Sequence, residues 1–507
     1  MKWKKVLLLV ANYKTTGYDF YDSAFPPLAL EYVAAYVEDL VEVVILDSKA
    51  ANLSLSQVKE EIDKFKPDLV GLTVPVSSAI KNVLNYAKIA KQSGCTTVIG
   101  GWHPTLAVEQ TLSSAWIDIL VRGEGEFTFR ELIQKGSPKN IDGLSYKLDG
   151  KIIHNPDRTF LKNLDELKLP SRHLIKHYNY KIFNMNCDAI ETSRGCPQGC
   201  KFCSTHVVYK RSWRPRSVEN IIKELEIISQ NKKITDVFFV DDNFLVDMKR
   251  IKKLCIEIIK AKKNKRIKKN LKFFFQGRLD AMARYPEITK LMGRAGFWLV
   301  LVGVEATDEH TLKKIRKGCK LESIKKGIQV LHESGIFIMG NVIIGVNLED
   351  TIEDILITIK KTRELDLDMP SFTLLTPFPS TGYYNEMKEQ GLLLTEDYSK
   401  YNWLNSVIKT PNLTPEALRI LLFLGFFYIN YYGGGWWNKV RLLRKGLKSR
   451  GIRYIFHPVR WFNTARTYIK WRKIVHYNLR DLGKKRHQIK FATLKEMEEL
   501  KNAIMES

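Results

Sequence analysis

The sequence predicts an α/β chain in which two parallel sheets follow one another and a helical region comes last. Over about the first 135 residues, short apolar segments alternate with amphipathic ones, the pattern of a Rossmann-like, doubly wound parallel sheet. Six further apolar segments between residues 185 and 380 leave room for intervening helices and predict a partial (β/α)6 barrel of the TIM type. The remainder is rich in aromatic and basic residues with helical patterning. The expected domains are 1–140, a linker over 141–182, 183–400 and 401–507.

The first sheet is expected to contain five buried strands. Each is a short run of apolar, mostly β-branched residues, which is typical of parallel strands covered on both faces. Helices are expected between them, for example over Leu28–Glu38 and Ser56–Phe65. In the linker, Asp149-Gly150 predicts the turn of a small hairpin. The expected strands are Val6–Val10, Val43–Leu46, Leu69–Thr73, Thr97–Ile99 and Ile117–Arg122.

The second series predicts the barrel strands. In such barrels the chemistry lies at the carboxyl ends of the strands. A cysteine triplet follows the first expected strand directly, so we expect it at that end. The expected strands are Asp188–Thr192, Val237–Asp241, Phe273–Gly277, Trp298–Val304, Ile336–Ile344 and Ser371–Thr376.

The amino-acid composition indicates the cellular compartment of the protein. Seven cysteines, three of them in one motif, argue against a secreted disulfide framework and favour a cytoplasmic protein. The apolar run at Val6–Val10 is too short for a signal peptide, and no segment reaches the roughly 20 apolar residues of a membrane span.

The formal net charge is +26 and is concentrated in two segments. One is the run Lys249–Lys272. The other extends from Gly433 to Lys490, where Asp481 is the single acid among 17 Lys and Arg residues. Such segments attract polyanions, and the aromatic residues of the second favour helices lying at a lipid headgroup interface. We therefore expect the C-terminal region to contact the inner face of the membrane. A solvated basic surface is the alternative for both segments.

The cysteine triplet is the most informative motif. Cys196, Cys200 and Cys203 follow the spacing C-x3-C-x2-C. Thiolates are soft ligands that suit iron–sulfur clusters or zinc. Zinc would need a fourth nitrogen or sulfur ligand, for which only His206 is near in sequence. A cubane cluster with one open iron needs only three cysteines, and buried free thiols are the remaining alternative.

The triplet, with Phe202 just before its last cysteine, resembles the radical S-adenosylmethionine (SAM) family. The resemblance implies that Cys196, Cys200 and Cys203 hold three irons of a 4Fe-4S cluster and that SAM chelates the fourth iron. It also implies reductive cleavage of SAM to a 5′-deoxyadenosyl radical, with Phe202 near the adenine. The family implies a ferredoxin or flavodoxin as electron donor.

Polar residues at the ends of later barrel strands are expected to bind SAM. Asp242 resembles the family's SAM-amine region, with helix N-capping as the alternative for it and its neighbour. Gln276 and Arg278 end the third strand, and Arg278 either pairs with the SAM carboxylate or only with Asp280. Glu305 resembles the glutamate of the family's Gly-x-Glu motif.

The first sheet carries signals that together resemble the cobalamin-binding domain found ahead of many radical SAM domains. Hydroxyls lie where strands end, and a double glycine permits close approach of a flat ligand. The sister group's Asp-x-His-x-x-Gly motif is absent, so we expect cobalamin without a protein imidazole on cobalt; His103 reads as a packing or hydrogen-bonding residue. A docking module without corrin is the alternative. The expected cobalamin-binding residues are Thr73, Ser77, Ser78, Gly100, Gly101 and Trp102.

These patterns favour a radical C-methyltransferase that acts on an apolar or lipid-like substrate. A radical cyclase or oxidative ring-forming enzyme on a lipid or tetrapyrrole is the alternative, because the segment from Glu396 to Trp403 is similar to the anaerobic Mg-protoporphyrin ester cyclase branch. Transfer-RNA methylthiolation would need three more N-terminal cysteines, and Cys95 is the only cysteine before Cys187. Nucleic-acid binding by the basic tail would leave the triplet unexplained.

Overall fold

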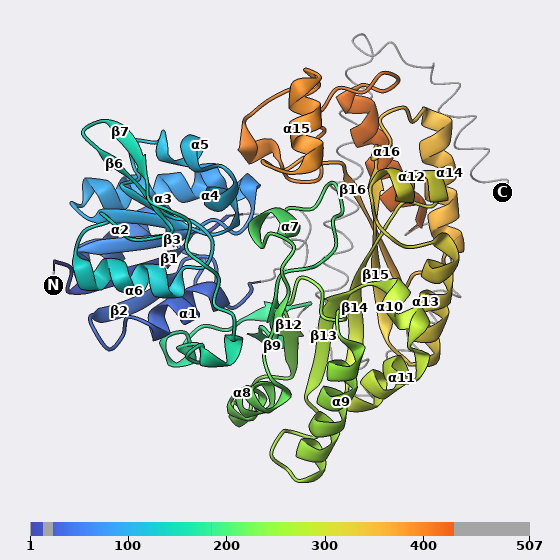
Figure 1. Ribbon diagram of the computed structural model, residues 1–507, viewed down its shortest axis with the longest axis horizontal. Helices are drawn as coiled ribbons and strands as arrows, with labels where there is room; N and C mark the ends of the chain where they lie inside the picture. Colours follow the sequence, from blue (N-terminus) through green and yellow to red (C-terminus); the bar gives the residue numbers. More distant parts are fainter. Residues whose placement is uncertain (1, 14–23, 184, 430–507) are drawn as a thin grey trace.

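The computed structural model describes residues 2–13, 24–183 and 185–429, which form two seven-stranded sheets side by side and a two-stranded ribbon (Figure 1). The C-terminal segment for which we expect membrane contact lies outside the described residues. Within them, no helix is both long enough and apolar enough to cross a bilayer.

The first sheet is doubly wound, as expected. Its strand order is β2-β1-β3-β4-β5-β6-β7, with parallel pairing from β2 to β5. Alternate side chains of β1 face opposite ways: Leu7 and Leu9 pack with helices α2 and α3, whereas Val6 and Leu8 pack with α1 and α6. The strands are β1 (Lys5–Val10), β2 (Glu42–Asp47), β3 (Leu69–Thr73), β4 (Thr96–Gly100), β5 (Ile119–Val121), β6 (Leu144–Leu148) and β7 (Lys151–His154). The helices named here are α1 (Leu28–Ala35), α2 (Leu55–Phe65), α3 (Ile80–Gln92) and α6 (Glu126–Lys135).

The hairpin expected in the linker is present and extends this sheet. β6 and β7 pair antiparallel with β5 and with each other. Asp149 and Gly150 form its turn, with φ of 48° and 75°. The first sheet therefore has seven strands where the sequence predicted five.

The second sheet has the sequential order β16-β15-β14-β13-β12-β9-β8 and is parallel from β9 to β16. All six expected barrel strands are present, displaced by a few residues at most. Helices cover its outer face (Figure 1). The strands are β8 (Lys181–Ile182), β9 (Met185–Ile190), β12 (Asp236–Phe239), β13 (Lys272–Gly277), β14 (Phe297–Glu305), β15 (Phe337–Ile344) and β16 (Met369–Leu374). The helices are α8 (Val218–Gln230), α9 (Met248–Lys263), α10 (Leu279–Arg284), α11 (Pro286–Ala295), α12 (Glu309–Lys314), α13 (Leu321–Glu333), α14 (Ile352–Glu364) and α16 (Pro415–Phe427).

Aromatic packing fixes the barrel strands against these helices. Five buried phenylalanines interlock with ring centroids 5.0–5.6 Å apart. Rings in such tilted and edge-to-face arrangements contribute about 1 kcal/mol per pair beyond their buried area. The phenylalanines are Phe239, Phe244, Phe273, Phe275 and Phe297.

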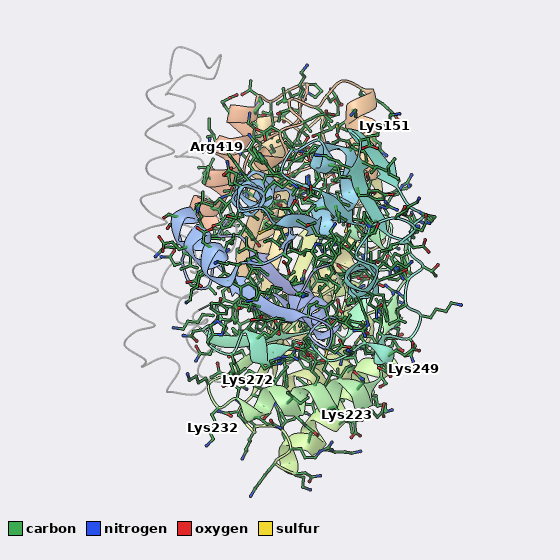
Figure 2. The ribbon with its side chains drawn as sticks, turned by 90° about the vertical axis from the view of Figure 1, so that its left-hand side faces the viewer. Lys151, Lys223, Lys232, Lys249, Lys272 and Arg419 are labelled. Carbon is green, nitrogen blue, oxygen red and sulfur yellow. The ribbon has the colours of Figure 1, made fainter. Side chains whose placement is uncertain are left out.

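The basic run 249–272 covers α9 and the turn before β13, so it extends from the carboxyl end of β12 to the amino end of β13. Lys232 and Lys272 lie at that end of the molecule (Figure 2). The cysteine triplet follows the carboxyl end of β9. The start of the run lies near the cysteine loop, because Arg250 donates a hydrogen bond to the Thr192 carbonyl at 2.6 Å. The affinity of the run for polyanions stays a prediction.

Candidate functional site

The loops at the carboxyl edge of the first sheet face the cysteine side of the barrel. Helix α4 (Trp102–Leu106) lies against α7 (Thr205–Val208), and Trp102 meets Tyr209 with ring centroids 5.8 Å apart. Ser380, beyond β16, donates a hydrogen bond to the Leu106 carbonyl at 3.1 Å. These contacts bring residues expected for cobalamin and residues expected for the cluster to one interface.

A short ribbon closes the neck of the cysteine loop. β10 (Ser193–Arg194) precedes the triplet and pairs antiparallel with β11 (Arg214–Pro215), which follows it. Gly195 has φ of +88°, and a Cβ there would collide with the Ser212 carbonyl oxygen. Only glycine fits this tight neck.

Asp242 holds the cysteine loop at both ends. It accepts hydrogen bonds from the Gly195 N–H at 3.1 Å and from the Thr205 hydroxyl at 3.2 Å. Burial raises its pKa to about 6. The helix-capping alternative is wrong, because Asp247 caps α9. A contact between Asp242 and SAM stays a prediction.

Asp241 holds the strand before the loop. It is 1% exposed and accepts hydrogen bonds from the hydroxyls of Thr192 and Ser193 at 2.8 and 2.5 Å. The two neighbouring aspartates thus fix the chain on the way into the triplet.

The three thiols form a donor set that fits a 4Fe-4S cluster. Burial raises the pKa of Cys196, and raises that of Cys203 to about 11. A buried thiol becomes a thiolate ligand when a metal cation offsets this desolvation. Among the described residues, no three His, Cys, Asp or Glu side chains are placed to hold a single metal ion. A cubane binds each cysteine to a different iron and needs no such arrangement.

Phe202 lies half-buried against the barrel core. Its neighbour Lys201 is tied to the barrel by two backbone hydrogen bonds, from its N–H to the Ile315 carbonyl at 3.0 Å and from the Tyr383 N–H to its carbonyl at 3.2 Å. These bonds fix the middle of the triplet. The expected contact of Phe202 with adenine stays a prediction.

Gln276 in β13 and Arg278 just after it, the two side chains expected to bind SAM here, differ in their surroundings. The Gln276 side chain is exposed. Arg278 pairs with Asp280 at 3.0 Å and donates to the Lys317 carbonyl at 2.8 Å. The Asp280 pairing is thus present in the structure.

Glu305 lies at the end of β14 in a left-handed conformation, with φ of +68°. Its carboxylate forms a buried ion pair with Lys317 at 2.9 Å. A Cβ on Gly303 would collide with that carboxylate, which explains the glycine two residues earlier. A positive φ in a non-glycine residue costs about 1–3 kcal/mol and is found at functional sites.

The expected cobalamin residues lie together at the carboxyl edge of the first sheet. Gly101 has φ of +103°, and a Cβ there would lie 2.9 Å from the Val74 carbonyl and 3.0 Å from the Thr73 hydroxyl. Gly100 ends β4; half-buried Trp102 begins α4, and half-buried Ser78 lies in the 3-10 turn Ser77–Ala79 after β3. Small residues and bare backbone suit the approach of a large flat ligand.

His103 is a hydrogen-bonding residue, as the sequence indicated. It is fully buried, and its two ring nitrogens bond to the Ser77 hydroxyl and the Gln110 side-chain oxygen, both at 3.0 Å. Burial lowers its pKa to about 4. The Ser77 hydroxyl is thus turned toward His103.

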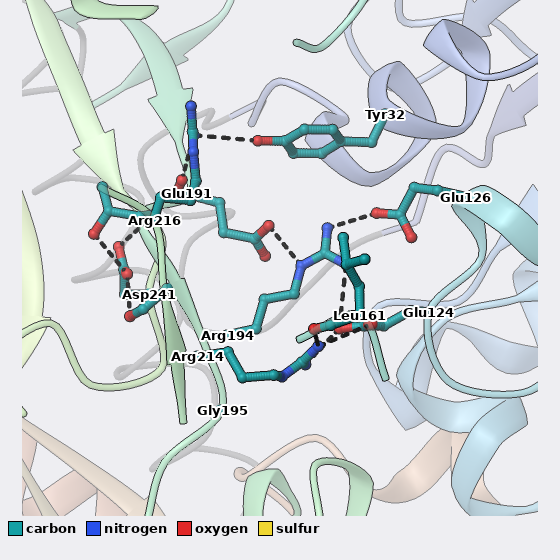
Figure 3. A network of polar contacts seen from close by, with 12 residues as sticks. Tyr32, Glu124, Glu126, Leu161, Glu191, Arg194, Gly195, Arg214, Arg216 and Asp241 are labelled. Carbon is teal, nitrogen blue, oxygen red and sulfur yellow. Dashed lines mark hydrogen bonds and ion pairs between the residues drawn. The ribbon is translucent and has the colours of Figure 1, made fainter. Parts of the chain in front are cut away.

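An ion-pair network joins the two sheets and was not predicted (Figure 3). Arg194, directly before the neck of the cysteine loop, pairs with Glu126 at 2.5 Å and with Glu191 at 2.8 Å. Glu124 pairs with both Arg194 and Arg214. The sequence signal was the segment Arg-Gly-Glu-Gly-Glu at 122–126, which places two acids close together after β5.

Two family profiles match the chain. The radical SAM superfamily profile matches residues 190–362, and the B12 binding domain profile matches residues 21–133.

The similar proteins are methyltransferases and a cyclase. An uncharacterized methyltransferase of Pyrococcus horikoshii is 33% identical over 85% of this chain and 93% of its own. The anaerobic magnesium-protoporphyrin IX monomethyl ester cyclase of Rubrivivax gelatinosus is 28% identical over 82% of this chain and 74% of its own. The hopanoid C-3 methylase of Methylococcus capsulatus is 28% identical over 77% and 74%.

Solved structures share the fold. The cobalamin-dependent SAM radical enzyme OxsB, with aqua-cobalamin and SAM bound, superposes with a TM-score of 0.66 at 17% identity, covering 95% of this chain and 80% of that one. The radical SAM methyltransferase TsrM of Kitasatospora setae, with cobalamin and a [4Fe-4S] cluster, gives 0.61 at 19% identity, covering 76% and 78%.

The protein is therefore a radical SAM enzyme with a cobalamin-binding domain. It belongs to the cobalamin-binding radical SAM family, which contains methyltransferases and the magnesium-protoporphyrin cyclase. Its cofactors are a 4Fe-4S cluster, SAM and cobalamin.

Proposed function

We propose that this enzyme transfers a methyl group to an unactivated carbon of an apolar or lipid-like substrate. The observation that supports it most is the meeting of two edges: the carboxyl edge of the first sheet and the cysteine loop of the barrel contact each other through α4 and α7. When bound, the cluster with SAM supplies a hydrogen-abstracting radical, and cobalamin supplies a transferable methyl group.

In this proposal the chain's own residues bind and orient. Cys196, Cys200 and Cys203 hold the cluster, and Asp242 holds their loop. Glu305 and Arg278 orient the charged end of SAM. Each has an internal partner, Lys317 or Asp280, which fixes the side chain at a strand end and leaves other acceptor or donor positions free.

The edge of the first sheet would take the corrin without a histidine ligand. Both nitrogens of His103 are already hydrogen-bonded inside the domain. Gly100 and Gly101 let the corrin approach the backbone. Thr73 at the end of β3, Ser78 in the turn after it and Trp102 at the start of α4 contact the corrin.

Two observations favour an apolar substrate. Half-buried Phe378 and Trp403 meet beyond the end of β16 with ring centroids 5.5 Å apart, on the same side of the barrel as the cysteine loop. The methylase relatives named above include one whose substrate is a hopanoid. We extend that substrate class to this chain.

The test is an anaerobic reaction of the reconstituted enzyme with SAM, cobalamin, a low-potential reductant and a total lipid extract. We expect a lipid heavier by one CH₂ group, together with 5′-deoxyadenosine and S-adenosylhomocysteine. Cys200→Ala is the control and should give none of them. Methylation of added polar metabolites but of no lipid would contradict the proposed substrate class.

A radical cyclase is the second candidate, because a cyclase relative matches 82% of the chain. Ring closure would give a product lighter by hydrogen, with 5′-deoxyadenosine and without S-adenosylhomocysteine. A tetrapyrrole ester offered beside the lipid extract separates the two candidates.

We also propose a ferredoxin or flavodoxin as electron donor and peripheral membrane contact by the residues after about 433. Removal of that segment should weaken binding to anionic liposomes while the iron content stays the same. Unchanged liposome binding would exclude the contact.

A further inference from the structure

The two short strands that flank the cysteine loop each carry an arginine, and both arginines form ion pairs with the same carboxylate. Arg194 of β10 and Arg214 of β11 pair with Glu124 at 3.2 and 2.6 Å, and Arg214 makes a second contact with its other oxygen at 3.1 Å (Figure 3). Such two-pronged arginine–carboxylate contacts fix orientation as well as distance. Glu124 therefore clamps the neck of the loop from outside the barrel.

The second clamp is Glu126. It pairs with Arg194, which is only 5% exposed and has a third partner in Glu191 of the barrel. Buried ion pairs of this kind contribute little net stability compared with apolar packing, but each constrains geometry because leaving one charge unpaired is costly. The function of these ion pairs is therefore inferred from where they lie, next to the cysteine loop, and not from how many there are.

Glu124 lies in the loop between β5 and α6, and Glu126 is the first residue of α6; the loop also contacts the cobalamin edge. The Gly123 N–H donates to the Thr105 hydroxyl at 3.0 Å, and that hydroxyl donates to the Gly101 carbonyl at 2.8 Å. A continuous series of contacts thus runs from Gly101 through Thr105 and the loop to Arg194, two residues before Cys196.

We propose that Glu124, Glu126, Arg194 and Arg214 are positioning residues that set the cluster loop relative to the bound corrin. This inference rests on the proposed function, in which both cofactors serve one substrate. A misplacement of reacting groups by about 1 Å costs roughly a hundredfold in rate. Contacts that fix the cluster loop relative to the corrin would therefore protect the rate of methyl transfer. If these contacts transmit the position of the corrin edge to the loop, cobalamin binding should alter the surroundings of the cluster.

The test is electron paramagnetic resonance of the reduced cluster in the full-length enzyme, with and without cobalamin. We expect cobalamin to shift the signal of the parent enzyme. In Glu124→Gln the shift should be lost, while iron content and cobalamin binding persist. The ratio of 5′-deoxyadenosine to methylated product should rise about tenfold, because radical formation and methyl transfer are no longer aligned.

The matched control is Glu131→Gln, which breaks ion pairs with Lys135 and Arg158 inside the first domain and should keep the parent's shift. If Glu124→Gln is isolated without iron, the same measurement is made on Glu126→Gln, in which Arg214 keeps its partner Glu124. A shift that persists in the variant, or is absent from the parent, overturns the inference. A cobalamin-dependent shift without any methylated product would contradict the proposed function and leave the link intact.

Discussion

The carboxyl edges of the two parallel sheets meet, yet they are built from different chemistry. The barrel edge is charged: Asp242 holds the cysteine loop, and the buried pair Glu305–Lys317 lies at a strand end. The edge of the first sheet presents glycines and hydroxyls, with Gly101 in a conformation that other residues adopt with strain.

The difference follows from what each edge has to bind. A cluster and the amino-acid end of SAM carry charge, so they need fixed counter-charges in a buried place. A corrin is large and flat, and glycines and small side chains leave room for its close approach. Perturbing one edge should therefore disable one cofactor and spare the other.

The largest effect is expected from Cys200→Ala. Loss of one of three thiolate ligands should remove the cluster and lower reductive SAM cleavage at least about a thousandfold, while cobalamin affinity stays within about twofold. Iron analysis and 5′-deoxyadenosine quantification check this. Cys255→Ala, which changes a buried thiol in α9, is the control and should retain iron. Full iron occupancy in Cys200→Ala would refute the assignment.

The converse experiment is Gly101→Val. Its side chain would meet the Val74 carbonyl and stand where the corrin is expected, so cobalamin affinity should fall about tenfold or more. Iron content and SAM cleavage should be unchanged. Gly150→Ala has a similar positive φ but open space around it, and should bind cobalamin normally. Titration of each variant with cobalamin, followed by absorbance, measures the affinity. If Gly101→Val binds cobalamin as tightly as the parent, the corrin does not bind at Gly101.

A third variant tests whether the buried charges at the barrel edge stabilise the protein and bind SAM. Glu305→Gln leaves the buried Lys317 cation without its partner, which should lower the free energy of unfolding by about 3 kcal/mol. SAM affinity should fall as well. Glu219→Gln, which breaks an exposed pair with Lys253, should leave the unfolding temperature near that of the parent. Thermal unfolding of both variants gives their unfolding temperatures. If both temperatures fall by the same amount, the buried pair Glu305–Lys317 matters no more for stability than the exposed pair.

The last effect concerns the pH dependence of stability and is expected away from both edges, at Glu31 of α1. Burial raises its pKa to about 8, with Arg172 opposing the shift and Asp188, Glu224 and Asp47 adding to it. Its carboxylate oxygens have no hydrogen-bond partner among the described residues.

Because the folded protein binds this proton more tightly than the unfolded chain does, its contribution to stability is full below about pH 4.5 and is lost as pH rises to about 8. Glu31→Gln should therefore unfold at a higher temperature than the parent at about pH 8.5, and the gap should narrow at about pH 6. A gap that widens on acidification would show the opposite sign.

Local patterns predicted most of the fold. Runs such as Leu69–Thr73 became strands at the expected residues, because buried parallel strands are apolar throughout. The hairpin around Asp149 was predicted, but its pairing with β5 was not, since strand pairing at a sheet edge depends on tertiary contact.

The site divides in the same way. The cysteine loop is a local motif and could be read directly. Glu124 and Arg214 are 90 residues apart, and their pairing depends on how the two domains pack. Asp242 was expected near SAM, but its two bonds to the cysteine loop depend on the path of that loop.

The central claim is that one active site uses both cofactors for methyl transfer. The most direct measurement is the amount of 5′-deoxyadenosine, S-adenosylhomocysteine and methylated substrate formed in the same anaerobic reaction, with and without cobalamin. The account predicts equal amounts of all three with cobalamin, and 5′-deoxyadenosine alone without it. Methylated product in the absence of cobalamin, or 5′-deoxyadenosine with no S-adenosylhomocysteine in its presence, would contradict it.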